Sequence, residues 1–246
     1  MTFTTTRVIW DKTHRLINSS YPPIDLFEDI ADPHDWDLLC AAEAKTNPRI
    51  NQSVGNLDLV APERRVSGTG ASYVMAPFTH ISLDWQGRFH NGSYGAYYAG
   101  DSFETAMFEV IHHRQAFFAS TNEAAGWMTD QRELVGKINQ ELVDIRSGAD
   151  GSKYADGSKE NFDELLDKND YSASQAFALN AKNSGHNGIV YPSVRHQDGE
   201  CFAVFYPDVI SIPKQGKHIG LHWDGERINQ IRIYQSPRNI VYEIEP

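Results

Sequence analysis

The sequence predicts a mixed α+β domain, with a mixed sheet as its core and helices on its flanks. Predicted strands outnumber predicted helices, and most of the strands are joined by short turns. Hydrophobic residues make up 40% of the 246 residues and charged residues 22%, so the chain has enough apolar material for a core. No clear linker divides it, and we therefore expect a single domain over residues 1–246.

Three helices carry start signals and helical spacing. The first spans residues 32–45, with Asp32 as its N-cap. The second begins at the N-cap Asp101 and reaches residues 113–118, with an apolar stripe along one side. The third spans residues 172–183. These segments are the expected flanking helices.

Short apolar runs bounded by turn residues predict the strands. They are residues 73–75, 94–99, 134–138, 142–145, 188–194, 201–206, 227–234 and 240–244. A turn separates 134–138 from 142–145, and turn-rich stretches at 85–93 and 146–160 predict surface loops. Residues 1–60 form a leading segment, which we interpret as an N-terminal extension of the core.

Composition excludes several classes of protein. The net charge of −11 repels phosphate backbones, so we expect no direct nucleic-acid partner. Two cysteines, Cys40 and Cys201, cannot form a disulfide framework or a cysteine-rich zinc site, and they favour a reducing compartment. No signal peptide and no membrane-length apolar run is visible. We expect a cytoplasmic protein with no membrane partner.

Charged residues in unusual settings are candidates for chemistry. Glu109 lies among apolar residues on the second helix, either on an exposed stripe or at the edge of a cleft with a polar partner. Arg88 follows Gly87, and Arg65 precedes a glycine pair. Each is either a solvated loop arginine or a group that holds an anion.

Tyrosine and serine residues add two further candidates. Tyr94 and Tyr98 share one face of their predicted strand, which either joins the core or stacks on a flat ring. Ser193 ends a predicted strand, either as a turn former or as a hydrogen-bond donor to a ligand or a catalytic carboxylate. It lacks the surroundings of a hydrolase nucleophile.

Histidines allow a metal-site hypothesis. Glu109 and His112 have the i, i+3 spacing that can bind a metal, and a site could be completed from His80, His90 and His196. No second Glu-x-x-His and no His-Glu-x-x-His occurs, so we expect no metal. The sequence also has no P-loop, no G-x-G-x-x-G after a strand and no C-x-x-C, which disfavours nucleotide triphosphate hydrolysis and a Rossmann dehydrogenase.

Three stretches taken together resemble the RES-domain family, over roughly residues 60–225. They are Gly87-Arg88-Phe89 with Tyr94-Gly95-Ala96-Tyr97-Tyr98-Ala99, then Glu104-Thr105-Ala106 leading to Glu109 and His112-His113-Arg114, then Gly188 to His196 followed by Gly199-Glu200-Cys201. The order and spacing of these motifs make the resemblance specific.

The resemblance implies a toxin of a bacterial toxin–antitoxin pair, with a fold similar to the ADP-ribosyltransferases. NAD would be its substrate, and an Xre-type antitoxin that blocks the NAD cleft would be its partner. The family's Glu and Ser fall on Glu109 and Ser193, and its Gly-Arg element falls on Arg88. Tyr98 ends the motif strand, and a further upstream Arg falls on Arg65. Tyr73 joins the NAD-binding residues, and a homodimer stays open.

Cleavage of the nicotinamide–ribose bond develops positive charge on the ribose, which a carboxylate at Glu109 would stabilise. The acceptor is water, phosphate or a protein side chain. Two other readings remain: a metal-dependent hydrolase that uses Glu109 and His112, and a protein-binding module without enzymatic activity.

Overall fold

The computed structural model describes residues 3–19, 32–47, 54–84, 86–146, 162–234 and 239–244. The loop expected over 146–160 lies outside these residues, apart from Arg146. One eight-stranded sheet forms the core, in the order β1-β2-β5-β4-β3-β6-β7-β8. Its strands are β1 (Thr5–Asn18), β2 (Tyr97–Gly100), β3 (Gly126–Asp144), β4 (Gly188–Pro192), β5 (Glu200–Val204), β6 (Lys214–Trp223), β7 (Ile228–Tyr234) and β8 (Ile240–Glu243).

The sheet is mixed, because β3 and β4 run parallel while the other neighbours are antiparallel. The α-helices are α1 (Trp36–Glu43), α3 (Ser72–Thr79), α4 (Phe103–Ala119) and α5 (Ser172–Asn183). Single 3-10 turns cover Pro33–Asp35, Leu57–Leu59, Pro62–Arg64, Asp163–Leu166 and Pro207–Val209. The predicted mixed sheet with flanking helices is confirmed.

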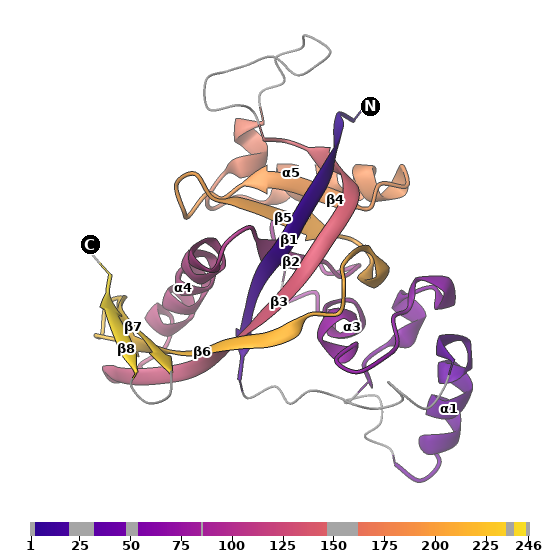
Figure 1. Ribbon diagram of the computed structural model, residues 1–246, viewed down its shortest axis with the longest axis horizontal. Coiled ribbons are helices and arrows are strands. Elements are labelled where there is room, and N and C mark those ends of the chain that lie inside the picture. Colours follow the sequence, from indigo (N-terminus) through magenta and orange to yellow (C-terminus); the bar gives the residue numbers. More distant parts are fainter. Residues whose placement is uncertain are drawn as a thin grey trace.

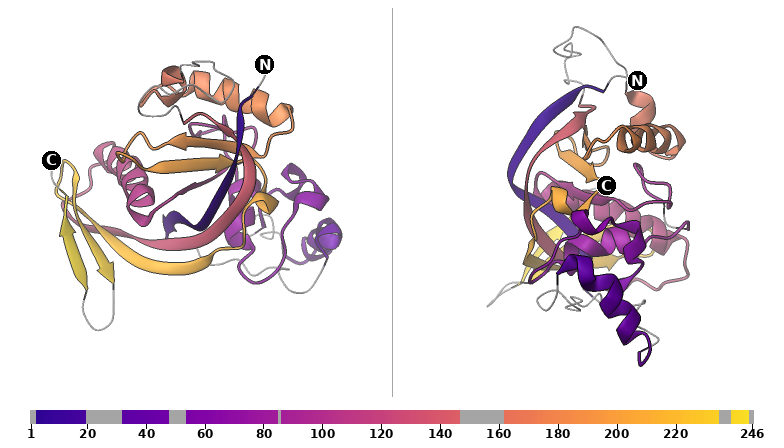
Figure 2. Two further views of the ribbon diagram at one scale, coloured as in Figure 1. Left: turned by 45° about the horizontal axis from the view of Figure 1, so that its top comes forward. Right: turned by 90° about the vertical axis from the view of Figure 1, so that its right-hand side faces the viewer.

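Five strands of the sheet close on themselves. β1 pairs with β3 from Thr5↔Val143 to Asn18↔Gln131, and its other edge meets β2 at His14↔Gly100. Together with the β2–β5, β5–β4 and β4–β3 pairings, this completes a ring. Figures 1 and 2 show β1 and β3 side by side as two long, curved strands. The ring brings the second half of β1 next to the end of β2.

The leading segment is not simply an extension of the core, because β1 forms one wall of the ring. No strand is predicted over residues 5–18, since the alternation of Val8 and Trp10 breaks at Asp11-Lys12. The structure explains the break as a register shift between Trp10 and Thr13 in the β1–β3 ladder. A bulge of this kind changes which face the later side chains occupy.

Residues 126–144 form one strand, which corrects the prediction of two short strands separated by a turn. Polar residues over 139–141 suggested the turn. In the structure they face solvent and pair with β1, where Arg7 donates to Asn139 at 2.7 Å and Thr5 donates to Glu141 at 2.8 Å. A polar outer face is therefore compatible with a continuous strand.

Residues 73–75 belong to helix α3, so the strand predicted there is wrong. Val74, Met75 and Phe78 are at most 6% exposed, and burial on several sides removes the polar face that marks an amphipathic helix. Pro77 lies inside this short helix. The backbone of Gly95 packs so closely against Pro77 that a side chain at position 95 would collide with it.

The other predicted helices are confirmed with small shifts. α5 has the predicted bounds, and Asp32 caps the turn before α1 by accepting the His34 N–H at 2.9 Å. The N-cap of α4 is Ser102 rather than Asp101, since the Ser102 hydroxyl accepts the Thr105 N–H at 3.1 Å. α1 lies at the periphery, away from the sheet (Figures 1 and 2).

Three apolar clusters fill the space between the layers. One packs α3 and the 54–60 segment against the ring, one packs α5 against β4 and β5, and one packs α4 against β6 and β7. Because α4 and α5 cover different parts of the sheet, the strand ends between them stay partly open. This opening holds the candidate site.

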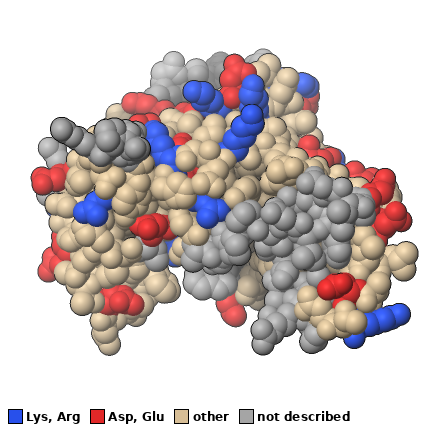
Figure 3. Space-filling model, turned by 60° about the horizontal axis from the view of Figure 1, so that its bottom comes forward, with Lys and Arg blue, Asp and Glu red and all other residues tan. Residues whose placement is uncertain are grey.

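The surface carries both signs of charge. On the face drawn in Figure 3, acidic and basic side chains are interspersed in the described part of the chain. Within the described residues, no helix combines the length and apolar character needed to cross a membrane.

Candidate active site

A cavity of about 290 Å³ lies between α4 and the strands β1, β2, β4 and β5. This volume is at the lower end of the range for small-molecule pockets. Its walls come from segments far apart in the sequence. The lining residues are His14, Arg15, Leu16, Gln86, Gly87, Arg88, His90, Tyr98, Ala99, Gly100, Ala106, Glu109, Val110, His113, Tyr171, Tyr191 and Cys201.

Glu109 faces this cavity from the middle of α4 and is half-buried. Its carboxylate Oε1 accepts a hydrogen bond of 2.7 Å from the hydroxyl of Ser193, which follows the end of β4. The exposed-stripe interpretation of Glu109 is therefore wrong, and the polar partner expected for a cleft carboxylate is Ser193.

The Ser193 hydroxyl has a fixed direction. Its oxygen accepts the main-chain N–H groups of Arg195 at 3.2 Å and His196 at 3.0 Å. A hydroxyl has two acceptor positions and one proton, so this proton remains for Glu109. The Ser193 N–H closes the turn by donating to the Gly199 carbonyl at 2.8 Å, and the turn packs against α4, since a side chain at Gly199 would lie 2.5 Å from the Thr105 hydroxyl. The turn after β4 thus orients the carboxylate.

Arg88 lies in the tight turn between Gly87 and His90 and is 7% exposed. Its Nη1 donates to the main-chain oxygens of Leu165 at 3.1 Å and Asp167 at 2.6 Å, and its guanidinium lies 4.7 Å from the ring centre of Tyr171. These contacts fix the guanidinium at the cavity wall.

Tyr98 lines the cavity and also holds the Arg88 turn. Its hydroxyl accepts the Phe89 N–H at 2.9 Å, and the hydroxyl of Tyr94 donates to the Phe89 carbonyl at 2.8 Å. The two tyrosines, which were predicted to share a face, therefore both hydrogen-bond to the main chain of Phe89. A side chain at Gly87 would lie 2.6 Å from the ring of His90 and 2.9 Å from the Tyr98 hydroxyl, so only glycine fits there.

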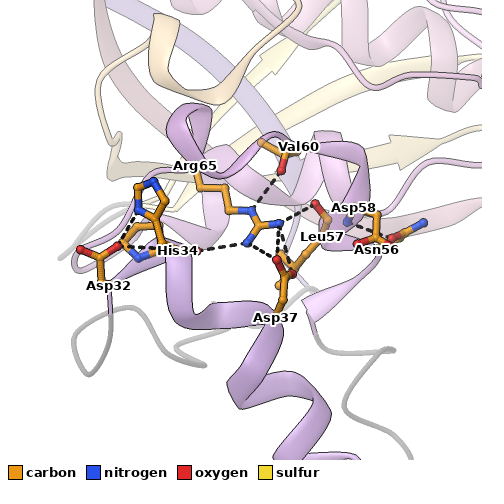
Figure 4. A network of polar contacts seen from close by, with 9 residues as sticks. Asp32, His34, Asp37, Asn56, Leu57, Asp58, Val60 and Arg65 are labelled. Carbon is orange, nitrogen blue, oxygen red and sulfur yellow. Dashed lines mark hydrogen bonds and ion pairs between the residues drawn. The ribbon is translucent and has the colours of Figure 1, made fainter.

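Arg65, which the sequence offered as a group that holds an anion, lies outside the cavity. Its side chain is 2% exposed. Figure 4 shows its guanidinium enclosed by acceptors of the 33–60 segment. They are the main-chain oxygens of Val60 at 3.0 Å, Pro33 at 3.1 Å and Leu57 at 3.2 Å, and the carboxylate of Asp37 at 3.1 Å. Arg65 therefore holds α1 and its neighbours together.

Tyr73 is also absent from the cavity lining. It lies on α3, and its hydroxyl accepts a hydrogen bond of 2.9 Å from Nη1 of Arg132 on β3. The structure thus gathers Arg88, Tyr98, Glu109 and Ser193 at one place and puts Arg65 and Tyr73 elsewhere.

Arg15 is a cavity residue that the sequence did not single out. Its Nη1 donates to the Tyr98 carbonyl at 3.0 Å, and its guanidinium lies 4.6 Å from the ring centre of Tyr97. Burial lowers the pKa of Arg15, which shows how little solvent surrounds the charge. Strand β1 was not predicted. The only local sign of Arg15 in the sequence is that a basic residue directly precedes the apolar pair Leu16-Ile17.

Two histidines near the cavity, His90 and His112, have lowered pKa values. Burial, together with the charge of Arg15, lowers the pKa of His90 to about 4. Burial and the charges of Arg195 and other neighbours lower the pKa of His112 to about 4 as well. His113, rather than His112, lines the cavity beside Glu109. Among the described residues, no group of three or more His, Cys, Asp or Glu could hold a metal ion.

Comparison with known proteins agrees with this arrangement of motifs. A sequence model of the RES domain matches residues 62–224, which include all three motif stretches and confirm the resemblance. The uncharacterized protein y4oC of Sinorhizobium fredii (strain NBRC 101917 / NGR234) is 28% identical over 239 residues, 97% of this chain and 93% of that protein. The crystal structure of the M. tuberculosis MbcT–MbcA toxin–antitoxin complex matches with a TM-score of 0.46 and 12% identity, over 88% of this chain and 86% of that chain.

Proposed function

The chain belongs to the RES domain family, and from this premise we propose that it is a toxin enzyme that breaks the nicotinamide–ribose bond of NAD. The observation that carries the proposal is the joint presence of one oriented carboxylate, Glu109, and two guanidinium groups, Arg15 and Arg88, around one cavity. A dinucleotide offers a ribose that becomes positive in the reaction and a pyrophosphate that is negative throughout.

The two arginines suit the pyrophosphate. A protein with a net charge of −11 repels a polyanionic ligand unless cations are concentrated locally, and planar guanidinium groups match phosphate oxygens by paired hydrogen bonds. Arg15 takes the role that the sequence had assigned to Arg65. The cavity of about 290 Å³ takes the nicotinamide riboside end, with the ring against Tyr98, and the adenosine end extends beyond it.

Glu109 acts on the ribose. As the bond to nicotinamide breaks, the ribose gains oxocarbenium character, and a nearby carboxylate stabilises this charge. The hydrogen bond from Ser193 keeps the carboxylate in place, so little reorganisation is needed during the reaction. Because the charge exists mainly in the transition state, loss of Glu109 lowers kcat far more than it raises KM.

The products depend on the acceptor. Water gives hydrolysis, inorganic phosphate gives phosphorolysis, and a protein side chain gives ADP-ribosyl transfer. Each route consumes NAD in the cytoplasm, so growth arrest follows. A neutralising Xre-type antitoxin would cover the cavity and exclude NAD, in keeping with the family resemblance.

Purified protein incubated with NAD tests the proposal directly. We expect release of free nicotinamide in the presence of a metal chelator, and product analysis with and without phosphate identifies the acceptor. Glu109→Gln should lower turnover by about 10²–10³-fold. Glu104→Gln is the matched control, since this glutamate is exposed on the first turn of the same helix.

Three outcomes contradict the proposal. Absence of nicotinamide release by folded wild-type protein removes the activity, and release that the chelator abolishes points to the metal-dependent hydrolase. Equal turnover by the Glu109→Gln and Glu104→Gln proteins removes the assignment of Glu109.

A further inference from the structure

A second carboxylate stands behind the cavity wall, paired with a histidine. Nδ1 of His14 on β1 lies 2.7 Å from Oε1 of Glu133 on β3. In the β1–β3 ladder His14 is opposite Val135, so Glu133 is its diagonal neighbour on the same face of the sheet. The Glu133 side chain is 4% exposed and that of His14 is 14% exposed.

Glu133 is held as a carboxylate. Its second oxygen, Oε2, accepts the main-chain N–H of Lys217 at 2.8 Å, and the absence of a side chain at Gly216 leaves room for it. Burial on its own would raise the pKa of Glu133, but the hydrogen bonds from His14 and from the Lys217 N–H outweigh burial and lower it. The acid therefore stays ionised and keeps accepting from the imidazole.

The salt bridge of Glu133 is with His14, and the charge of Lys217 adds a weaker attraction. A buried ion pair is often no more stabilising than a well-packed apolar pair, so stability alone does not account for Glu133 at this position. What it achieves is orientation. With Nδ1 held by Glu133, Nε2 is the nitrogen that His14 can offer to a ligand.

His14 of β1 lines the same cavity as Glu109, Ala106 and Val110 of α4. We propose, on the basis of the proposed function, that His14 is the proton acceptor for the nucleophile and that Glu133 is its positioning residue. Two carboxylates then have different roles, Glu109 in the cavity lining and Glu133 behind it. Glu109 stabilises the ribose cation, and Glu133 never touches the substrate.

With water as the nucleophile, the reaction is hydrolysis of the nicotinamide–ribose bond. The bond between ribose C1′ and the nicotinamide nitrogen breaks, and its electron pair neutralises the pyridinium to give nicotinamide. The water oxygen forms the new bond to C1′, and its proton moves to Nε2 of His14. The products are nicotinamide and ADP-ribose, and His14 later returns the proton to solvent. Another O–H nucleophile follows the same balance.

Several other charged groups contact His14, share the cavity with it or contact Glu133. They are Glu133 on β3, Lys217 on β6, Glu109 and His113 on α4, Arg15 next to it on β1, and Arg88 in the 86–90 turn. A pH–rate profile of the wild type alone therefore cannot isolate His14, and variants are required.

Steady-state kinetics of NAD turnover in full-length protein test the proposal. We expect His14→Ala to lower kcat by about 10²–10⁴-fold with little change in KM, to remove the acidic limb of the kcat profile, and to be partly rescued by added imidazole. Glu133→Gln keeps the shape of the side chain and should lower kcat less. Asp32→Asn is the matched control, because Asp32 forms the same contact with His34 at 2.8 Å on the exposed surface.

Three results would overturn the role of His14. Wild-type kcat and pH profile in His14→Ala, or a loss that appears only in KM, overturns the assignment. If His14→Ala fails to fold, His14→Gln retains a donor to Glu133 but cannot accept a proton, and wild-type kcat in that variant overturns it equally. If wild-type protein releases no nicotinamide from NAD, the proposed function fails and the role of His14 fails with it.

Discussion

The hydroxyl of Ser193 donates a 2.7 Å hydrogen bond to the carboxylate of Glu109, across 84 residues of sequence. The bond joins the middle of α4 to the residue that follows β4. Local contacts within α4 could not create this link. The same hydroxyl also stabilises the turn after β4, because its oxygen accepts two main-chain N–H groups.

Removal of this hydroxyl should damage catalysis more than folding. Ser193→Ala leaves the Glu109 carboxylate without its donor, and a hydrogen bond to a charged group contributes about 1.5–3 kcal/mol. We expect kcat to fall by about 10–100-fold with KM nearly unchanged, measured as nicotinamide release from NAD. Ser120→Ala is the control, because this exposed serine bonds only to its own helix, through the Phe117 carbonyl. A wild-type kcat in Ser193→Ala would show that Glu109 does not depend on it.

Two arginines that look alike in the sequence should respond in opposite ways. Arg15→Ala removes a cavity guanidinium, so we expect KM for NAD to rise by about 10–100-fold, since a charged hydrogen bond contributes about 1.5–3 kcal/mol. Arg65→Ala removes the donor to the Val60 carbonyl, at about 1–3 kcal/mol, and the second donor to the Leu57 carbonyl, which keeps the Val60 N–H. Its Tm should drop by several degrees, at about 2–4 °C per kcal/mol, while KM stays near wild type.

Kinetics and thermal melts of both variants decide this prediction. A rise in KM for Arg65→Ala without loss of Tm would return Arg65 to the substrate site, and an unchanged KM for Arg15→Ala would remove Arg15 from it.

Stability should fall between pH 7 and pH 5 because of buried neutral histidine. Burial and the charge of Arg15 lower the pKa of His90 from 6.5 to about 4, and no described residue accepts from or donates to its Nδ1. The unfolded chain therefore binds a proton at a pH where the folded protein does not. The contribution of His90 to stability is complete above pH 6.5 and is lost as the pH falls toward 4.

Thermal melts from pH 7.5 to pH 5 measure this effect. We expect His90→Gln to reduce the loss of Tm on acidification and His34→Gln, an exposed histidine, to leave it unchanged. His112, whose pKa is also about 4, accounts for part of the remaining loss. An identical pH dependence in His90→Gln and wild type would contradict the buried, neutral state of His90.

Local signals in the sequence were sufficient for much of the fold. Spacing and capping gave α5 with its observed bounds, located α1 and α4, and marked the short strands β4, β5, β7 and β8. They failed where tertiary contacts replaced the local pattern. α3 is apolar on most sides because it is buried, and β3 keeps its polar middle because β1 pairs with it throughout.

The candidate site divides in the same way. The sequence by itself singled out Arg88, Tyr98, Glu109 and Ser193 as candidates, since motif order and residue type mark them wherever they lie in space. Only the tertiary structure decided between Arg15 and Arg65, and only it paired His14 with Glu133. The reason is physical: long-range strand pairing sets which side chains share a cavity, and a bulge in β1 or one more ladder changes that set without leaving a local pattern in the sequence.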